Sequence, residues 1–499
     1  MFIETILLIG LLYLVYKIYH HYAERRTYWA RRGIKSPPDE FVFGHLRKLW
    51  DYSYPRGLVI RDWTKQYGKV YGIFDGAKPV LITSDLDMMN EVLVKQFDKF
   101  YARMRLPVQS NKQGSTTHMV EARGAQWKRL RALGSVAFTN KSLKHIGSTV
   151  EESAILTCNE IERRGKGGEI NIALFYQEFT LDIICKVALG KKDVIMFNNP
   201  YMQICRFFSQ RTLRHPMLVI PSLFPGVVDT LRFLMERTGN PISRLFKNLS
   251  DEIQQKKKER EQGAQSTTDF IDIFLDAEVD ESELTFGEHG DTSRKMHADE
   301  IVRQCFIFLL AGFDTTSTSL AFVTHFLANY PEIQEKMREE VDEVCPDESI
   351  DYENLAELKY TECVMKESLR HYPLASFAVS RECIEDTEVC GYKIHKGENI
   401  QMDSWSLHMD KEIWGEDAEE FRPERWLEDS PKHRLAFQTF GGGPRMCIGM
   451  RLAYIEEKMI LAHIMNRFII EKTNNTDPMK LVGGFSVSPE SVMVQLRRR

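Results

Sequence analysis

The stretch from Phe440 to Gly449 constrains this chain more than any other, because its residue order prepares a site for one cysteine sulfur. Glycines at 441 to 443 and at 449 let the backbone approach a flat partner without a Cβ in the way. Cys447 is predicted to lie at a helix N-terminus, where the dipole lowers the pKa of a thiol. The helix is indicated by apolar residues at helical spacing, namely Leu452, Ile455, Met459, Ala462 and Ile469.

A lone cysteine is usually a small buried apolar residue, but this one belongs to the ordered pattern F-x-x-G-x-R-x-C-x-G. The pattern resembles the haem-thiolate loop of the cytochrome P450 superfamily, and the resemblance extends along nearly the whole chain. It implies haem b as the cofactor, Cys447 as the iron ligand and Arg445 as a partner of a haem carboxylate. It also implies a mainly α fold with minor β.

The chain of 499 residues contains no Pro/Gly/Ser-rich linker and no internal repeat, so we expect one large domain. We place the haem-binding catalytic domain at 41–499, behind an N-terminal membrane anchor at 1–22 and a basic, proline-containing hinge at 23–40. Nine cysteines without a CxxC pair indicate a reducing compartment. The net charge of -5 argues against a nucleic-acid partner.

The anchor is predicted from an apolar run, Thr5 to Tyr16, that reaches an adequate span only when extended to Tyr22. Arginines follow at once, which places the rest of the chain in the cytosol, at the endoplasmic reticulum membrane. A cleaved signal peptide is the main alternative, but no basic n-region and no A-x-A-like site are present. The apolar segment Met217 to Val228 is either a buried loop or a second contact with the membrane.

The expected secondary structure is mostly helical between residues 120 and 380. A β-hairpin is predicted at 70–82, with Asp75-Gly76 at its turn. Ser84 is expected to cap the next helix, with Asp87 completing a capping box. A second small β region is predicted at 389–402, and a long helix at 298–330.

Ala311-Gly-Phe-Asp314-Thr315-Thr316 lies within that long helix. The threonine hydroxyls can bond back to i−4 carbonyls and distort the helix locally, and Gly312 would let a ring approach its backbone. Taken alone, Asp-Thr-Thr is more often a surface or capping pattern. The A-G-x-D-T-T resemblance implies a relay of Asp314 and Thr315 that delivers protons during oxygen activation.

Two further basic elements fit the carboxylates of haem. Trp127 and Arg131 stand one helical turn apart, where an indole N–H and a guanidinium can serve buried carboxylates, although an ordinary basic helix is the default without haem. Arg381 resembles another such ligand. Lys128, Arg129, Lys141 and Lys144 form either a docking face for an acidic electron donor or a merely solvated face.

Glu367 and Arg370 form an E-x-x-R pair, which by itself is a common surface ion pair. Phe421 to Trp426 resembles the PERF element of the family, so Arg425 would complete a buried structural triad that holds the cysteine loop. Breaking such a triad leaves an uncompensated buried charge.

The segments Gln126 to Arg131 and Asp269 to Asp276 resemble the clan of the vertebrate family-three drug oxidases and thromboxane synthase, with a nematode member as the nearest kind. The resemblance implies a monooxygenase that inserts one oxygen atom from O2 into a lipophilic xenobiotic, steroid or fatty acid. NADPH and flavins would act only through a partner reductase, with cytochrome b5 as a further candidate donor. The substrate pocket is expected from 100–124, 200–228, 374–378 and 483–486.

Two rival functions stay open at this point. A haem-thiolate isomerase or dehydratase would act on a peroxide without a reductase and would tolerate loss of the Asp314–Thr315 relay. A non-enzymatic haem carrier or sensor would need neither the relay nor a docking face. The intact relay sequence counts against the isomerase or dehydratase, and NADPH consumption that depends on added reductase and substrate would separate all three functions.

Overall fold

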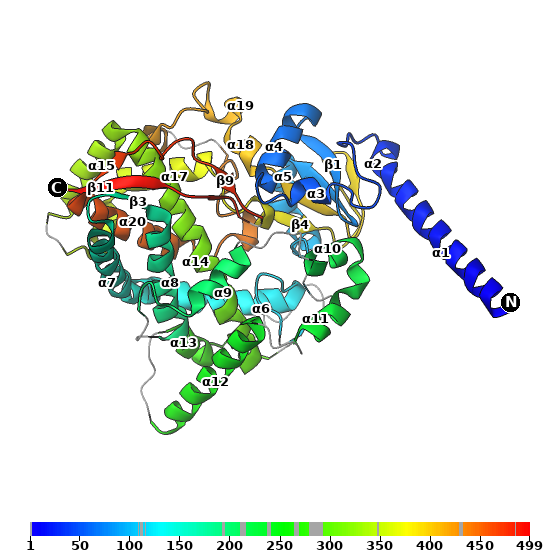
Figure 1. The fold of residues 1–499 in the computed structure, drawn as a ribbon, viewed down its shortest axis with the longest axis horizontal. Coiled ribbons are helices and arrows are strands. Elements are labelled where there is room, and N and C mark those ends of the chain that lie inside the picture. The colour runs from blue at the N-terminus through cyan, green and yellow to red at the C-terminus, as the bar shows by residue number, and fades with distance from the viewer. Residues whose placement is uncertain are drawn as a thin grey trace.

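A computed structural model describes residues 2–107, 109, 113–114, 116–191, 195–209, 216–236, 241–263, 269–278, 293–346, 349–428, 433–484 and 486–499. The molecule consists of a large helical part and a smaller β-rich part, from which the N-terminal helix projects (Figure 1). This arrangement confirms the predicted mainly α architecture with minor β.

The helices occupy most of the chain. The longer ones are α1 (Phe2–Arg26), α4 (Arg56–Tyr67), α6 (Gly124–Ser135), α7 (Asn140–Gly165), α8 (Ile172–Leu189), α9 (Tyr201–Ser209), α10 (Pro216–Leu223), α11 (Val228–Glu236), α12 (Pro241–Glu261), α13 (Phe270–Asp276), α14 (Ala298–Asn329), α15 (Pro331–Val344), α17 (Lys359–His371) and α20 (Met450–Arg467). The short ones are α2 (Tyr28–Arg31), α3 (Leu46–Leu49), α5 (Leu86–Asn90), α16 (Asn354–Glu357), α18 (Ser404–His408) and α19 (Lys411–Trp414).

The strands form four small sheets. Their bounds are β1 (Val70–Asp75), β2 (Lys78–Thr83), β3 (Glu169–Asn171), β4 (Ser380–Glu382), β5 (Thr387–Val389), β6 (Tyr392–Ile394), β7 (Asn399–Met402), β8 (Phe468–Lys472), β9 (Leu481–Val482), β10 (Ser488–Pro489) and β11 (Met493–Arg498). The largest sheet has the order β1-β2-β7-β4, with β2 and β7 parallel and the other pairs antiparallel. Of the second predicted β region, 389–402, only β7 joins the predicted hairpin, whereas β5 and β6 pair with each other in a separate sheet.

The hairpin of β1 and β2 forms as predicted, with Val70 opposite Thr83 and a turn at Gly76, whose φ is 63°. The following helix begins differently from the prediction. Asp85, not Ser84, is its N-cap, and the Asp85 side chain accepts a hydrogen bond from the backbone N–H of Met88 at 2.8 Å. A carboxylate accepts from the orphan amides at least as well as a hydroxyl, so both residues were suitable caps.

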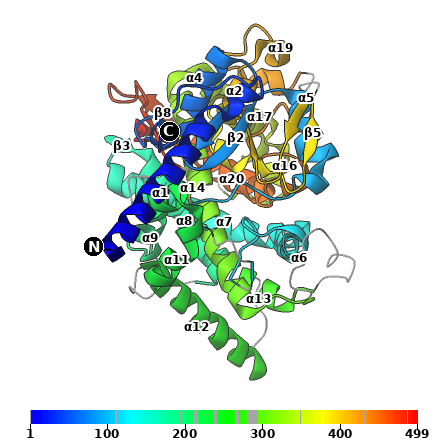
Figure 2. The same ribbon diagram turned by 90° about the vertical axis from the view of Figure 1, so that its right-hand side faces the viewer.

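Helix α14 crosses the middle of the helical part and packs against α8, α17 and α20 (Figures 1 and 2). Its start is fixed by a capping box between His297 and Glu300, and it continues as α-helix through all 32 residues. Most of its side chains are buried, many of them in the main apolar core. In the part of the chain that the structure describes, α14 is the one helix long and apolar enough to cross a membrane, and its burial explains that composition.

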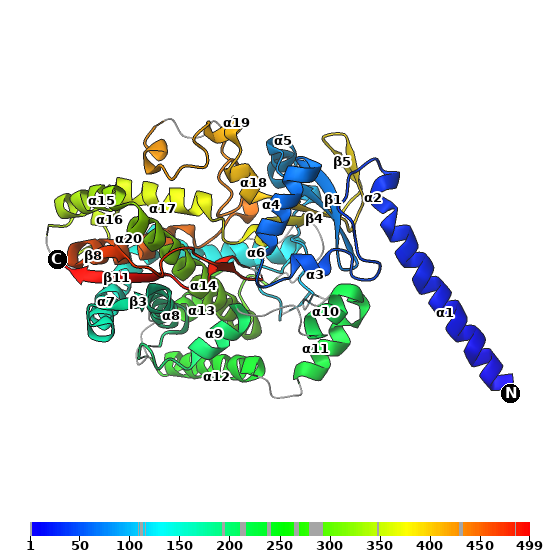
Figure 3. The same cartoon turned by 45° about the horizontal axis from the view of Figure 1, so that its top comes forward.

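Helix α1 projects from the body beside the β-rich part and carries several exposed apolar side chains (Figures 1 and 3). These are Ile9, Leu12, Tyr13, Val15, Tyr16 and Tyr19. Its last turn is tied to the body, because the buried Arg25 guanidinium donates to the carbonyls of Phe41 at 2.8 Å and Gly76 at 3.2 Å.

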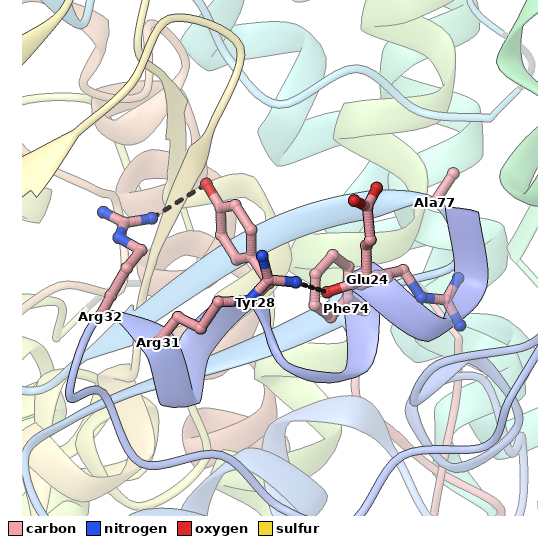
Figure 4. A pocket seen from close by; sticks show the side chains of 7 residues that line it. Glu24, Tyr28, Arg31, Arg32, Phe74 and Ala77 are labelled. Carbon is pink, nitrogen blue, oxygen red and sulfur yellow. Dashed lines mark hydrogen bonds between the residues drawn. The ribbon is translucent and has the colours of Figure 1, made fainter. Parts of the chain in front are cut away.

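A pocket of about 410 Å³ opens where α1 meets the β-rich part (Figure 4). In it, Arg31 donates to the carbonyl of Glu24 at 2.9 Å and Arg32 donates to the Tyr28 hydroxyl at 2.9 Å. The pocket shares no residue with the cysteine loop, so it belongs to the attachment of α1 rather than to the site described below.

Candidate functional site

The cysteine loop, Phe440 to Gly449, contains a short helical turn at Gly443–Arg445 and leads directly into α20. The backbone N–H of Cys447 donates to the carbonyl of Phe440 at 2.9 Å, which closes the loop. The backbone N–H groups of Gly449 and Met450 donate to the Cys447 sulfur. The predicted placement of Cys447 at the N-terminus of a helix is therefore confirmed, and the unpaired amides of the first turn supply the donors.

The prediction that the pKa of the Cys447 thiol is lowered is wrong for the protein without a bound metal ion. Burial raises the pKa of Cys447 and outweighs the amides of Gly449 and Met450 and the charges of Arg103 and Arg131, which act in the opposite direction. Desolvation disfavours a thiolate that has no partner. A metal ion reverses this balance, because a coordinating thiol is deprotonated outright.

Cys447 is exposed, and the neighbouring protein atoms are close enough to raise the pKa of its thiol. Ala311 is likewise exposed in the middle of α14, where Leu309 and Phe313 are buried. Ala311 of α14 and Cys447 of the cysteine loop are therefore both accessible to a ligand.

A cluster of buried arginines lies next to the loop. Burial and the charges of Arg103 and Arg381 lower the pKa of Arg445. The pKa of Arg103 is lowered to about 10 and that of Arg381 to about 9, again chiefly by burial. The Nε atoms of Arg103 and Arg381 are buried and have no hydrogen-bond partner among the residues that the structure describes. Such uncompensated positive charge calls for an anion.

Within the described residues, these arginines donate hydrogen bonds to backbone carbonyls. Arg445 donates to Ala122 at 2.6 Å and Tyr101 at 2.8 Å, Arg381 donates to Gly442 at 3.3 Å, and Arg103 donates to the Arg445 carbonyl at 3.0 Å. Neutral acceptors satisfy N–H groups but do not neutralise the charge. The arginines therefore fit the two carboxylates of haem, while Cys447 fits its iron.

Trp127 and Arg131 both stand on α6, as predicted. Trp127 is buried and its ring lies 4.3 Å from the guanidinium carbon of Arg445, so the structure brings these two predicted residues together. Burial lowers the pKa of Arg131, and proximity to Cys447 opposes this change. Sequence reasoning missed Arg103, which belongs to no motif and was only part of the predicted pocket segment 100–124.

The predicted docking face loses one member. Arg129 is fully buried, where it pairs with Glu300 of α14 and donates to the Lys295 carbonyl at 3.0 Å. Its expected exposure is therefore wrong. Lys141 is exposed, and Lys144 is exposed and paired with Glu353.

The predicted relay residues point to different partners. The Asp314 carboxylate accepts a hydrogen bond from the Ser486 hydroxyl, and the Thr315 hydroxyl donates to the Ala311 carbonyl at 2.8 Å. The back-bond of Thr315 is the predicted one, but α14 remains an unbroken helix, so the expected distortion is absent from it. Burial raises the pKa of Asp314, and the hydrogen bond from Ser486 opposes this rise.

The approach of a ring to Gly312 stays a prediction, and a Cβ at this position would also meet Ile184 of α8 at 3.1 Å. Gly312 therefore allows close packing of two helices. In the cysteine loop, Gly443 has a φ of 68° and its Cβ would lie 2.0 Å from the Leu93 carbonyl. Gly443 therefore permits the cysteine loop to lie close to the backbone at Leu93, whereas Gly441 has open space beside it.

The predicted triad is present and buried. Glu367 pairs with Arg370 at 2.8 Å and with Arg425 at 2.9 Å, and the Trp426 indole also donates to it at 2.9 Å. Burial alone would raise the pKa of Glu367, but hydrogen bonds from His371 and Arg370 and the charges of the two arginines hold it below its ordinary range. The charge of Glu367 is thus fully compensated.

Comparisons with known proteins agree with this geometry. The family described as Cytochrome P450 matches residues 35–496. Among curated proteins, CYP13A2 of Caenorhabditis elegans, a cytochrome P450 by name, is 43% identical over 489 residues, which is 95% of each chain. CYP13A1 of the same nematode is 41% identical, over 97% of each chain. The expected similarity to nematode members of the family is confirmed.

Proposed function

The chain belongs to the cytochrome P450 family, and on this premise we propose that it oxidises a lipophilic small molecule with electrons that a flavoprotein reductase takes from NADPH. Membership of the family makes the protein a haem-thiolate monooxygenase, an oxidoreductase that uses O2. The substrate class, the reductase and a contribution from cytochrome b5 are parts of the proposal.

The observation that carries the proposal is the Cys447 sulfur, which accepts from two backbone amides and lies beside a group of arginines whose acceptors among the described residues are backbone carbonyls. Cys447 would hold the iron of haem, and amides at the start of α20 would stabilise the negative charge on its sulfur. Arg445, Arg381, Arg131 and Trp127, together with Arg103, would hold the haem carboxylates. When bound, haem supplies the activation of O2.

The protein's own contribution to the chemistry would be proton delivery. Asp314 is a partly buried carboxyl group whose raised pKa brings it closer to the working pH of a general acid and base. The Thr315 hydroxyl lies next to it in sequence and can pass on a proton when it rotates away from the Ala311 carbonyl. Asp314 would exchange protons with the outside, and Thr315 would deliver them to the site.

The preference for lipophilic substrates is supported by the apolar surface around α10 and α11. Its exposed side chains are Ile220, Phe224, Val227, Phe233 and Leu234. A surface of this kind favours contact with membrane lipid, in which such substrates concentrate. Together with the exposed apolar side chains of α1, it supports attachment to the endoplasmic reticulum membrane with the catalytic domain in the cytosol.

The proposal is tested with the full chain in vesicles, a P450 reductase, NADPH, isotopically labelled O2 and a panel of steroids, fatty acids and xenobiotics. We expect labelled product only when reductase and NADPH are both present, and a loss of about 10²-fold in product per NADPH for Asp314→Asn. Conversion of a peroxide without NADPH would instead favour an isomerase or dehydratase. Haem binding without any turnover across the panel would contradict the proposed substrate class.

A further inference from the structure

The Asp314 carboxylate is held by a loop that comes from the far end of the chain. Ser486 lies between β9 and β10, and its hydroxyl donates to Asp314 Oδ2. Two residues further on, the Ser488 hydroxyl accepts from Thr318 at 3.3 Å. Thr318 follows Asp314 by one helical turn, so two serines of the loop contact two successive turns of α14. Figure 3 shows the C-terminal strands crossing this helix.

The same loop is fixed from its other side. The backbone N–H of Val487 donates to the Leu374 carbonyl at 2.9 Å, and its side chain packs with Leu58 and Trp405. Because side chains alternate along an extended segment, Val487 faces away from α14 while both serines face it. Val487 is therefore held on the side away from α14, and its two neighbouring serines are held on the side of α14.

The turn before Ser486 depends on Gly483. This glycine has a φ of 137°, and a Cβ on it would lie 1.9 Å from the Ser486 carbonyl. Its backbone N–H donates to the Tyr52 carbonyl at 2.9 Å. A residue with a side chain would displace Ser486, so the sequence at this turn is suited to keep the serine against α14.

We propose that Ser486 is a positioning residue for the proton relay, whose hydroxyl holds the Asp314 carboxylate in place from the loop expected to line the substrate pocket. The inference rests on the proposed function, because it assigns a role within the relay of Asp314 and Thr315. Ser486 touches Asp314 and acts through it.

The surroundings of Asp314 leave Ser486 as its main stabilising partner. The ionisable groups whose pKa responds to its charge are Tyr52, from the segment before α4, and Cys205 on α9. Both are acids, so neither stabilises a carboxylate. Glu490 also acts on Tyr52, and it is exposed and paired with Lys480 at 3.0 Å. Burial raises the pKa of Asp314 and Ser486 opposes the rise.

Loss of the Ser486 hydroxyl should thus raise the pKa of Asp314 further and leave a larger fraction of it protonated at a given pH. A relay that must release and regain a proton then works only at higher pH, so the acid limb of the pH–rate profile moves upward. If the loop only supported the fold, loss of this hydroxyl would instead lower the rate by the same factor at every pH.

The test compares Ser486→Ala and Ser486→Thr with a matched control, Ser488→Ala. The control removes the contact between Ser488 and Thr318 but keeps the hydrogen bond from Ser486 to Asp314. Product formed per NADPH is measured in the vesicle system between about pH 6 and pH 9. A readout that does not depend on activity is the infrared band of the protonated Asp314 carboxyl, identified by its loss in Asp314→Asn and titrated in each variant.

We expect Ser486→Ala to lower product per NADPH about tenfold on the acid side, less than the ~10²-fold loss of the proton-transfer group itself. Its carboxyl band should titrate at higher pH than in the unmodified protein. Ser486→Thr should restore both values, and Ser488→Ala should leave the titration unchanged. An unchanged titration in Ser486→Ala, or the same shift in Ser488→Ala, overturns the inference. A fully active Asp314→Asn overturns the proposed relay instead.

Discussion

At the scale of single residues, the most unusual groups outside the site are two adjacent buried carboxyls on α20. Glu456 and Glu457 both lie in the core, and Glu457 accepts a hydrogen bond from Ser319 of α14 at 2.9 Å. Burial raises the pKa of Glu457 to about 8 and that of Glu456 well above its ordinary value. The folded protein therefore holds protons that the unfolded chain has already released near neutral pH.

Glu457→Gln should remove part of this pH dependence. The folded-state pKa of Glu457 exceeds its unfolded value of about 4.3, so its favourable contribution is complete below that value and is lost as the pH rises through about 8. We expect the variant to gain thermal stability relative to the unmodified protein between about pH 5.5 and pH 8.5. Thermal unfolding at several pH values measures this difference.

Glu261→Gln, at an exposed position on α12, serves as the matched control and should show no such trend. A melting difference for Glu457→Gln that stays constant over the whole pH range would mean that this carboxyl is not held in its protonated form.

At the scale of elements, the cysteine loop is held by its contact with Glu91–Lys95, a turn of π-helix that includes Leu93. Gly441 and Gly443 have similar φ values of 73° and 68°, but only Gly443 would bring a Cβ against the Leu93 carbonyl. Gly441→Ala should cost about 1–2 kcal/mol through its left-handed backbone alone. Gly443→Ala should cost a further ~1–3 kcal/mol through overpacking.

The comparison of these two alanine variants separates the effect of steric overlap with the Leu93 carbonyl from the effect of backbone strain. Haem content and the thermal midpoint should fall clearly more in Gly443→Ala than in Gly441→Ala. Equal losses in the two variants would show that the approach of the loop to Leu93 does not matter for holding it.

Local patterns were enough to predict the elements that carry the site. The spacing after Gly449 predicted α20, although Ile469, the last residue of that series, lies in strand β8 beyond the end of the helix. The Asp75-Gly76 turn predicted the hairpin, and the E-x-x-R spacing predicted the pair Glu367–Arg370. Each of these features depends on residues within one or two turns of each other, so a single sequence contains the necessary information.

Contacts between distant segments could not be predicted in this way. Arg129 is buried by Glu300, and Asp314 is held by Ser486, in each case from more than a hundred residues away. The direction in which Gly312 faces depends on how α8 packs against α14, which helical periodicity alone does not determine. Motifs thus gave the residue types of the site, and packing determined their partners.

At the scale of the whole molecule, the proposed orientation in the membrane has a direct consequence for glycosylation. Asn140, Asn248 and Asn474 each begin an Asn-x-Ser/Thr sequence, and all three are exposed. Exposed sequences of this kind would be modified in the lumen of the endoplasmic reticulum. Because the catalytic domain is proposed to face the cytosol, we expect no glycosidase-sensitive change in mass in a eukaryotic host.

A version in which residues 1–22 are replaced by a cleaved secretion signal provides the control. It should become glycosylated, which would prove that the three sites are accessible to the modifying enzyme. Glycosylation of the unmodified chain would contradict the proposed topology.

The central claim for the whole molecule is that one cysteine sulfur binds the iron of haem. The purified protein is reduced with dithionite, carbon monoxide is added, and the Soret band is compared with those of Cys447→Ala and Cys390→Ala, the latter lacking the other exposed cysteine. We expect the red-shifted band of a thiolate-ligated haem in the unmodified protein and in Cys390→Ala, and its loss in Cys447→Ala. An imidazole-type band in the unmodified protein, or an unchanged band in Cys447→Ala, would contradict the claim.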